Sequence, residues 1–129
     1  MIIYILPSIS IFVNMLNMKI NFSECCPPLL LKHLQPDEAE RLAVMFRVLG
    51  EASRLQLLSL IASQPTGAAC VCELIEPLGL SQPTVSHHLK VLHDAGFLTK
   101  ERRGTWIYYR VVPETLQAIC GSLRLPGSA

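Results

Sequence analysis

The sequence lacks internal repeats and low-complexity tracts, and it carries little net charge for its length. Its 129 residues have a formal net charge of +1, and only 16% of them are charged. Half of the residues are hydrophobic, which excludes disorder over most of the chain because enough apolar surface is present to form a core. The length therefore predicts a single domain with its own core.

The first eighteen residues are strongly apolar and contain no charged residue. They lack the basic segment and the small-residue cleavage site of a secretory signal peptide. The stretch is long enough for a membrane span, but Pro7 and several serines and asparagines weaken that interpretation. We interpret residues 1–18 as an apolar N-terminal extension, a mis-assigned start of the reading frame with Met15 or Met18 as the true start, and expect no membrane partner.

The cysteines do not form a pattern that suits a disulfide framework. Their number is odd, Cys25 and Cys26 are adjacent, and Cys70 and Cys72 are one residue apart, whereas Cys120 stands alone. Neighbours this close are not expected to bridge without strain. In a reducing compartment, which we take to be the cytoplasm, such thiols are available to bind a metal ion.

Hydrophobic periodicity predicts helices in a domain at residues 36–125, which follows a cysteine-bearing arm at residues 19–35. Pro36 suits the first position of the first helix, and Gly50 can end it. The expected apolar faces of the five helices contain, in chain order, Ala39, Leu42, Ala43, Phe46 and Leu49; Leu55, Leu58, Ile61 and Ala62; Val71, Leu74, Ile75 and Leu78; Val85, Leu89 and Leu92; and Leu116, Ile119, Cys120 and Leu123.

After Gly96 the pattern changes from helical to alternating, which predicts a β-hairpin. Its strands are expected at residues 97–102 and 105–112, with Arg103-Gly104 as the turn. A helix from Pro113 closes the domain. The fold class is therefore mainly α with one β-hairpin, and the order of elements is that of a winged helix-turn-helix.

Positive charge is concentrated in residues 81–110, which have five basic and two acidic residues, whereas residues 1–80 have more acidic than basic residues. This asymmetry is typical of a surface that meets phosphates, although a solvated basic face would give the same count. The fourth helix begins with short polar side chains that suit base edges in a major groove. The predicted contacts to double-stranded operator DNA are Ser81, Gln82, Thr84, Ser86, His87, Lys90, Arg102 and Arg103.

Three segments resemble the ArsR/SmtB family of bacterial metal-responsive repressors. They are Leu49-Gly50-Glu51-Ala52-Ser53-Arg54-Leu55, the helix region from Leu80 to Leu92, and Ala95-Gly96-Phe97-Leu98. The family usually has Asp-Pro where this chain has Glu51-Ala52. The resemblance implies a homodimer joined through the first and last helices, with one recognition helix of each subunit reading a half-site of an imperfect palindrome.

The sequence Cys70-Val71-Cys72-Glu73-Leu74 opens the third helix. Residues two apart do not share a face of a regular helix, but in a frayed first turn both sulfurs can converge on one ion. A helix N-terminus also favours the thiolate, which is the form that binds metals. Cys25 and Cys26 on the arm would supply further ligands. The segment resembles the inducer box of the family's arsenic, cadmium and lead sensors, which implies a site made of Cys25, Cys26, Cys70 and Cys72.

Thiolates select soft ions, and this ligand set permits more than one of them. As(III) or Sb(III) takes three sulfurs, whereas Cd(II) or Pb(II) would use all four. The resemblance favours arsenite as the inducer, with no organic cofactor. Residues 113–129 contain no His or Asp, which argues against the family's zinc or nickel site on the last helix.

The predicted function is a repressor that occupies its operator without the ion and leaves it when ion binding ties the arm to the third helix. One alternative is a thiol-redox switch in which Cys25 or Cys26 pairs with Cys70 or Cys72. A small thiol enzyme or metal carrier is disfavoured because no positioned base, phosphate loop or oxyanion device is found near the cysteines. Cys120 is expected to be a buried apolar residue. His87, His88 and His93 are expected to contact DNA or solvent.

Overall fold

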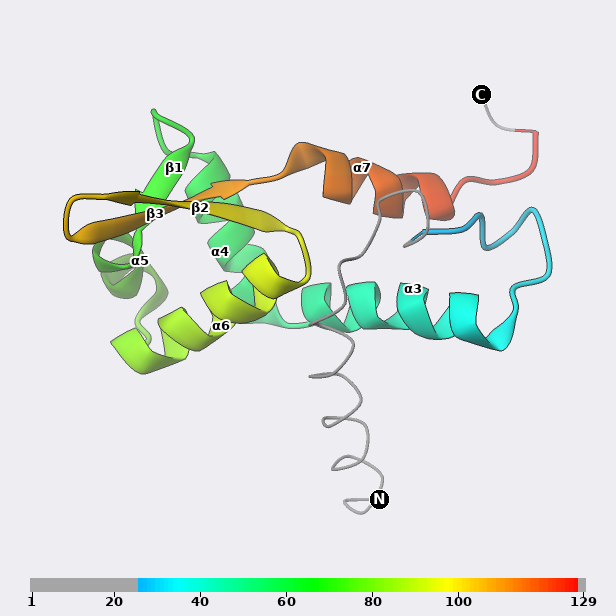
Figure 1. Cartoon of the computed structure of the whole chain (residues 1–129), viewed down its shortest axis with the longest axis horizontal. Coiled ribbons are helices and arrows are strands. Elements are labelled where there is room, and N and C mark those ends of the chain that lie inside the picture. The colour runs from blue at the N-terminus through cyan, green and yellow to red at the C-terminus, as the bar shows by residue number, and fades with distance from the viewer. Residues whose placement is uncertain (1–25, 128–129) are drawn as a thin grey trace, which may run out of the picture.

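The structure is a computed structural model that describes residues 26–127. Five helices and a three-stranded sheet make up the described part of the chain (Figure 1). The elements are α3 (Pro36–Leu49), α4 (Ala52–Ala62), β1 (Ala68–Cys70), α5 (Val71–Leu78), α6 (Gln82–Asp94), β2 (Leu98–Arg103), β3 (Trp106–Val111) and α7 (Pro113–Ser122).

The helix-turn-helix consists of α5 and α6. Gly79 ends α5 with a φ of +64°, a left-handed conformation that glycine adopts without a steric penalty. Ser81 then caps α6, because its side chain accepts a hydrogen bond from the Thr84 backbone N–H at 3.4 Å. The predicted start of the recognition helix and its buried face of Val85, Leu89 and Leu92 are therefore confirmed.

The sheet has three strands in the order β1-β3-β2, and both pairs are antiparallel. The predicted hairpin is present, but its turn lies one residue later than expected, at Gly104 and Thr105, since Arg103 pairs with Trp106. Strand β1 was not predicted. It has only three residues, two of them alanines, and a segment this short shows no alternation that a sequence could reveal.

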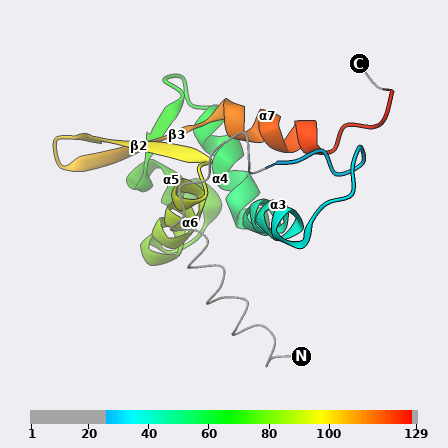
Figure 2. The ribbon, with the colours of Figure 1, turned by 45° about the vertical axis from the view of Figure 1, so that its right-hand side comes forward.

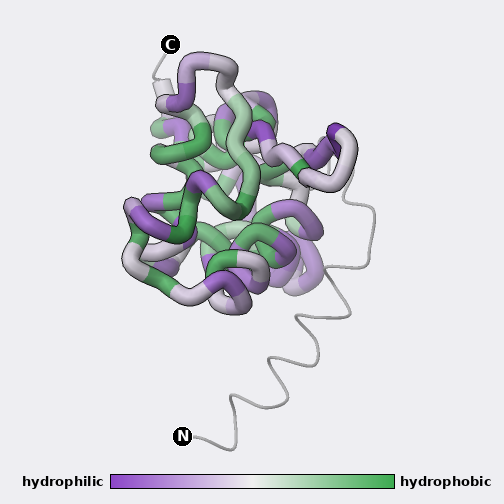
Figure 3. Tube along the Cα trace, turned by 90° about the vertical axis from the view of Figure 1, so that its left-hand side faces the viewer, coloured by the Kyte–Doolittle hydropathy of each residue, from purple (hydrophilic) through white to green (hydrophobic). Residues whose placement is uncertain are grey.

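The core packs α4, α5 and α6 beneath this sheet, and part of α3 and α7 joins it. Figure 3 shows the alternation of hydrophobic and hydrophilic residues along the chain that allows each helix to bury one side. The predicted faces of α3 and α4 were partly wrong. Helix α3 buries Val44, Met45 and Val48 more fully than Phe46, and α4 leaves Leu55 exposed at 51%. The side of a helix that is covered depends on its neighbours, and the apolar residues of α4 lie all round the helix, so its periodicity did not define a buried side.

Helices α3 and α7 extend from the same side of the winged core, and the arm at residues 26–35 lies with them (Figures 1 and 2). The backbone N–H of Leu29 donates to the carbonyl of Ser122 at 3.0 Å, which ties the arm to the end of α7. The start of α7 is fixed by Thr115, whose hydroxyl donates to the carbonyl of Gly96 at 2.6 Å. The arm therefore lies at the opposite end of the molecule from α5 (Figure 1).

His88 was expected to contact DNA or solvent, and this prediction was wrong, because its side chain is buried and only 7% of the residue is exposed. Its Nε2 lies 3.8 Å from a Glu51 carboxylate oxygen and its Nδ1 lies 3.4 Å from Nη1 of Arg54. Arg54 also donates to the carbonyls of Val48 and Arg47 at the end of α3. This cluster of charged and polar groups joins the α3–α4 corner to the recognition helix.

Residues 1–18, interpreted above as an N-terminal extension, lie outside the described residues, as does Cys25. Within residues 26–127, the longest helices are too short or too polar to cross a bilayer.

The burial of His88 predicts a pH dependence of stability. Burial lowers the pKa of His88, an effect that Glu51 opposes and that Arg54 and His87 reinforce. The unfolded chain therefore binds a proton more readily than the native one, so the free energy of unfolding is expected to fall as the pH drops below about 6.5. Denaturant unfolding at about pH 7 and about pH 5 should show a smaller fall for His88→Gln than for the wild type. An equal fall in both proteins would contradict this assignment.

Candidate nucleic-acid interface and thiol site

The first half of α6 presents a row of exposed polar side chains. Gln82, Thr84, Ser86 and His87 are all exposed, while Val85 between them is fully buried. Because the apolar residues hold this helix against the core, its opposite side is free to enter a groove. The structure thus places the predicted DNA-reading side chains together on one surface, and their contacts to DNA stay a prediction.

Lys90 lies one turn further along α6 and is held by an ion pair. Its Nζ is 2.8 Å from a carboxylate oxygen of Asp94, four residues later. Burial acts to raise the pKa of Asp94, but hydrogen bonds from Lys90 and His93 outweigh it, and this pKa lies below its usual value. Asp94 therefore stays ionised and orients an ammonium group whose other side faces solvent, as a phosphate contact requires.

The wing carries the two predicted arginines on opposite faces of β2. Both are exposed, and the guanidinium of Arg103 lies 4.7 Å from the centre of the Tyr108 ring and 3.3 Å from a Glu101 carboxylate oxygen. Trp106, opposite Arg103 in the hairpin, is 54% exposed. A tryptophan this exposed at the tip of a basic hairpin is a surface feature that the sequence analysis did not select.

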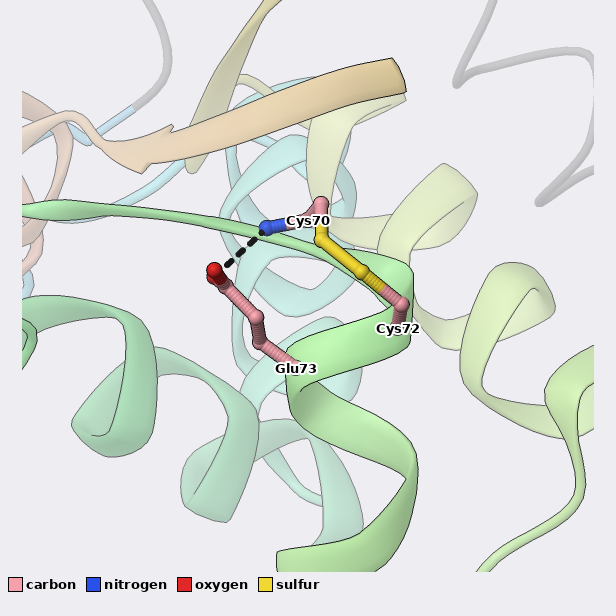
Figure 4. The surroundings of a disulfide bond; sticks show 3 residues. All are labelled: Cys70, Cys72 and Glu73. Atoms are coloured by element: carbon pink, nitrogen blue, oxygen red, sulfur yellow. Dashed lines mark hydrogen bonds between the residues drawn. A yellow bond between two sulfur atoms is a disulfide. The ribbon is translucent and has the colours of Figure 1, made fainter. Parts of the chain in front are cut away.

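The sulfurs of Cys70 and Cys72 are joined in a disulfide in the structure (Figure 4). A bridge between these two cysteines was not predicted, but the local backbone permits it. The reason is that Cys70 is not helical: it is the N-cap of α5 with extended backbone angles, so its side chain points toward that of Cys72 in the first turn. The structure brings together the two sulfurs that sequence reasoning had placed at one site.

The two cysteines of this pair differ in their exposure to solvent. Cys70 is 2% exposed, and its backbone N–H donates to the carboxylate of Glu73 at 3.2 Å in a capping box, whereas Cys72 is exposed. An approaching ion would therefore meet Cys72 first. Because both sulfurs lie at the N-terminus of α5, the partial positive charge of the helix end favours their thiolate forms when the bond is reduced.

Cys26, the arm cysteine within the described residues, is not joined to this pair. Cys26 is half-buried and packs against the core, on the arm that is tied to α7. Between residues 26 and 127, no three His, Cys, Asp or Glu side chains lie together in a way that could hold a metal ion. The predicted ligand Cys25 lies outside the described part of the chain.

Cys120 was expected to be buried, and it is exposed. Helix α7 turns Thr115, Ile119 and Ser122 toward the interior, so the neighbouring position 120 points away from it. Leu123, predicted on the same apolar stripe, is also exposed.

Comparison with known proteins decides the family. The model described as "Bacterial regulatory protein, arsR family" matches residues 52–100, which include α4, the helix-turn-helix and the start of the wing. The arsenical resistance operon repressor of Bacillus subtilis is 36% identical over 74 residues, which cover 57% of this chain and 69% of that protein. The chain belongs to the arsR family. It is a transcriptional regulator with a winged helix-turn-helix DNA-binding fold, and this family is not one of enzymes.

Solved structures agree with this arsR-family assignment. The AntR antimony-specific transcriptional repressor is 35% identical, and the match covers 72% of this chain and 84% of that chain with a TM-score of 0.57. A homodimeric winged helix-turn-helix domain from Mycobacterium bovis, a possible ArsR-family regulator, is 26% identical. That match covers 70% of this chain and 84% of the other, with a TM-score of 0.55.

The positions of Lys90 and Gln82 predict different effects on DNA binding in this arsR-family protein. Lys90→Ala should weaken binding to every duplex and reduce the salt dependence by about one phosphate contact. Gln82→Ala should relax the preference at one base pair, by about 1–3 kcal/mol. Fluorescence anisotropy on a selected duplex and on its single-base variants, over a range of salt concentrations, separates the two effects.

Gln56→Ala is the matched control, because Gln56 is an exposed glutamine on α4, outside the recognition helix. The assignment of Lys90 to a phosphate fails if Lys90→Ala leaves the salt dependence of binding unchanged.

Proposed function

We propose that the chain is a dimeric repressor that leaves its operator when As(III) or Sb(III) binds to thiolates of Cys70 and Cys72. The observation that carries this proposal is the convergence of these two sulfurs at the first turn of α5. Helix α5 packs directly against the recognition helix α6, so a change at its N-terminus acts on the part that reads DNA. The arsenical and antimony repressors among the relatives support the same class of inducer.

Two sulfurs are one fewer than a pyramidal As(III) or Sb(III) site uses, so a third ligand is required. The arm carries Cys26, but in the same chain the arm is tied to α7 and lies away from α5 (Figure 1). We therefore assign the third sulfur to Cys25 or Cys26 of the other subunit's arm. A site that also used the fourth sulfur would suit Cd(II) or Pb(II), the alternative inducers.

The proposed dimer follows from the surface at the α3 and α7 end. Among residues 26–127, five of the seven large hydrophobic side chains that are exposed lie on the arm or at the end of α7, namely Leu29, Leu30, Leu31, Leu123 and Leu125. The two others, Leu55 and Trp106, are elsewhere. Apolar side chains gathered in this way mark a surface that a partner covers, and the homodimeric relative supports a second copy as that partner.

Leu123→Asp is expected to shift the protein toward monomers, because it places a charge in the proposed interface. Leu55→Asp is the control, since Leu55 has a similar exposure of 51% against 47% for Leu123 and lies on α4. Sedimentation equilibrium measures the association of both variants. Equal dimerisation of the two would contradict an interface at the end of α7.

Arsenite release tests the proposed site. Reduced wild-type protein bound to an operator selected from random duplexes should lose at least about tenfold in affinity on addition of arsenite, within the range of ordinary allosteric coupling. Cys70→Ser and Cys72→Ser should stay bound, because each removes one thiolate. Anisotropy measures release, and ultraviolet absorption from sulfur-to-arsenic charge transfer measures binding of the ion.

Cys120→Ser is the matched control, because this exposed cysteine lies on α7, a different helix from the proposed site. It should behave as the wild type. Release of Cys70→Ser and Cys72→Ser by arsenite at wild-type concentrations would rule out the proposed site.

The disulfide between Cys70 and Cys72 favours a second candidate, a thiol-redox repressor. Hydrogen peroxide would oxidise the two thiols to the disulfide and be reduced to two waters, with the two thiol protons consumed. In this case peroxide would release the DNA and arsenite would not. The same anisotropy assay with each reagent in turn distinguishes the two candidates.

A further inference from the structure

The cysteine pair is directly attached to the wing through the unpredicted strand β1. Cys70 is the last residue of β1 and pairs with Tyr108 of β3, and Tyr108 in turn pairs with Glu101 of β2. The three residues therefore form a row across the sheet, from the thiol site to the hairpin. One end of this row is chemically responsive, and the other is on the element that carries the predicted backbone contacts to DNA.

Residues that face one another in antiparallel strands project from the same face of the sheet, with Cβ atoms about 4.5–5.5 Å apart. Cys70, Tyr108 and Glu101 thus share one face. Arg103 is two residues from Glu101 on the same strand, so it shares that face too. Arg102 projects from the opposite face, which makes the two neighbouring arginines unequal in their relation to the cysteines.

Two further contacts fix Arg103 on this face. Its guanidinium lies 4.7 Å from the centre of the Tyr108 ring, within the range of a cation–π interaction. It also lies 3.3 Å from a carboxylate oxygen of Glu101. Tyr108 therefore lies between the two sites: a movement of Cys70 in β1 would displace it, and its ring orients Arg103.

We propose that Tyr108 is a positioning residue that couples the inducer site to the wing: ion binding at Cys70 displaces β1 against β3, and Tyr108 transmits this to Arg103. The proposal rests on the function proposed above and adds a second route beside the contact of α5 with α6. A general disturbance of the fold would affect Arg102 and Arg103 alike, whereas this proposal assigns the coupling to Arg103 and not to Arg102. Two sites are coupled through packed side chains when ligands at both sites favour or disfavour the same arrangement of those side chains. Here the two sites are the cysteine pair and the DNA-contacting wing, and the shared arrangement is the stacking of Arg103 on Tyr108.

The experiment compares four variants with the wild type as reduced full-length protein, with arsenite as the probe. The measured quantity is the ratio of operator dissociation constants with and without arsenite. Tyr108→Leu, which removes the ring, and Arg103→Ala should each reduce this ratio at least about threefold. Tyr108→Phe keeps the ring and should retain the wild-type ratio.

Arg102→Ala is the matched control, since it removes a neighbouring charge on the other face of the hairpin. It should weaken DNA binding by the same factor with and without arsenite, which leaves the ratio unchanged. Arsenite binding itself, followed by ultraviolet absorption, should be the same in all four variants, and thermal unfolding followed by circular dichroism checks that Tyr108→Leu is folded at the assay temperature.

Three results would overturn the proposal. A wild-type ratio in Tyr108→Leu would show that the ring does not transmit the signal, and an equal loss of the ratio in Arg102→Ala would show that any wing charge suffices. Loss of arsenite binding in Tyr108→Leu would make Tyr108 part of the site. In each case the wild type still releases DNA, so the proposed function stands. Absence of release in the wild type would instead reject both.

Discussion

The pairing of β1 with β3 is the contact on which the functional arrangement depends. Only three residues of β1 take part, but they fix the end of the strand at Cys70, where α5 begins. Because Cys70 is held extended by the sheet, its sulfur meets that of Cys72 in the first helical turn. The same pairing places Cys70 opposite Tyr108 of the wing. Without β1, the cysteine pair would belong to the helix-turn-helix alone.

Two sets of contacts fix the recognition helix, one apolar and one polar. Val85, Leu89 and Leu92 fix its apolar side in the core, and burial of this kind contributes about 1.5–3 kcal/mol for each large side chain. His88, with Glu51 and Arg54, adds a polar cluster that reaches the end of α3. This cluster therefore ties the recognition helix to the α3–α4 corner.

The pattern of residues was enough to predict most of the helix-turn-helix and the hairpin. Ser81 and Gly79 are local signals, since capping and a left-handed turn depend on the residues themselves. The exposure of Gln82, Thr84 and Ser86 followed from the apolar residues on the other side of the same helix. The four cysteines were predicted as metal ligands because clustered thiols indicate metal binding even when the fold is not known.

The predictions that were wrong concern residues whose burial depends on neighbours distant in the sequence. His88 is buried because the α3–α4 corner covers it, and Cys120 is exposed because α7 turns other residues inward. The sequence alone determined the order of the five helices and the hairpin and the exposed polar side of α6, because capping and periodicity are properties of short segments. Only the tertiary structure decided that Cys70 meets both Cys72 and the wing, because strand pairing joins residues that no local pattern connects.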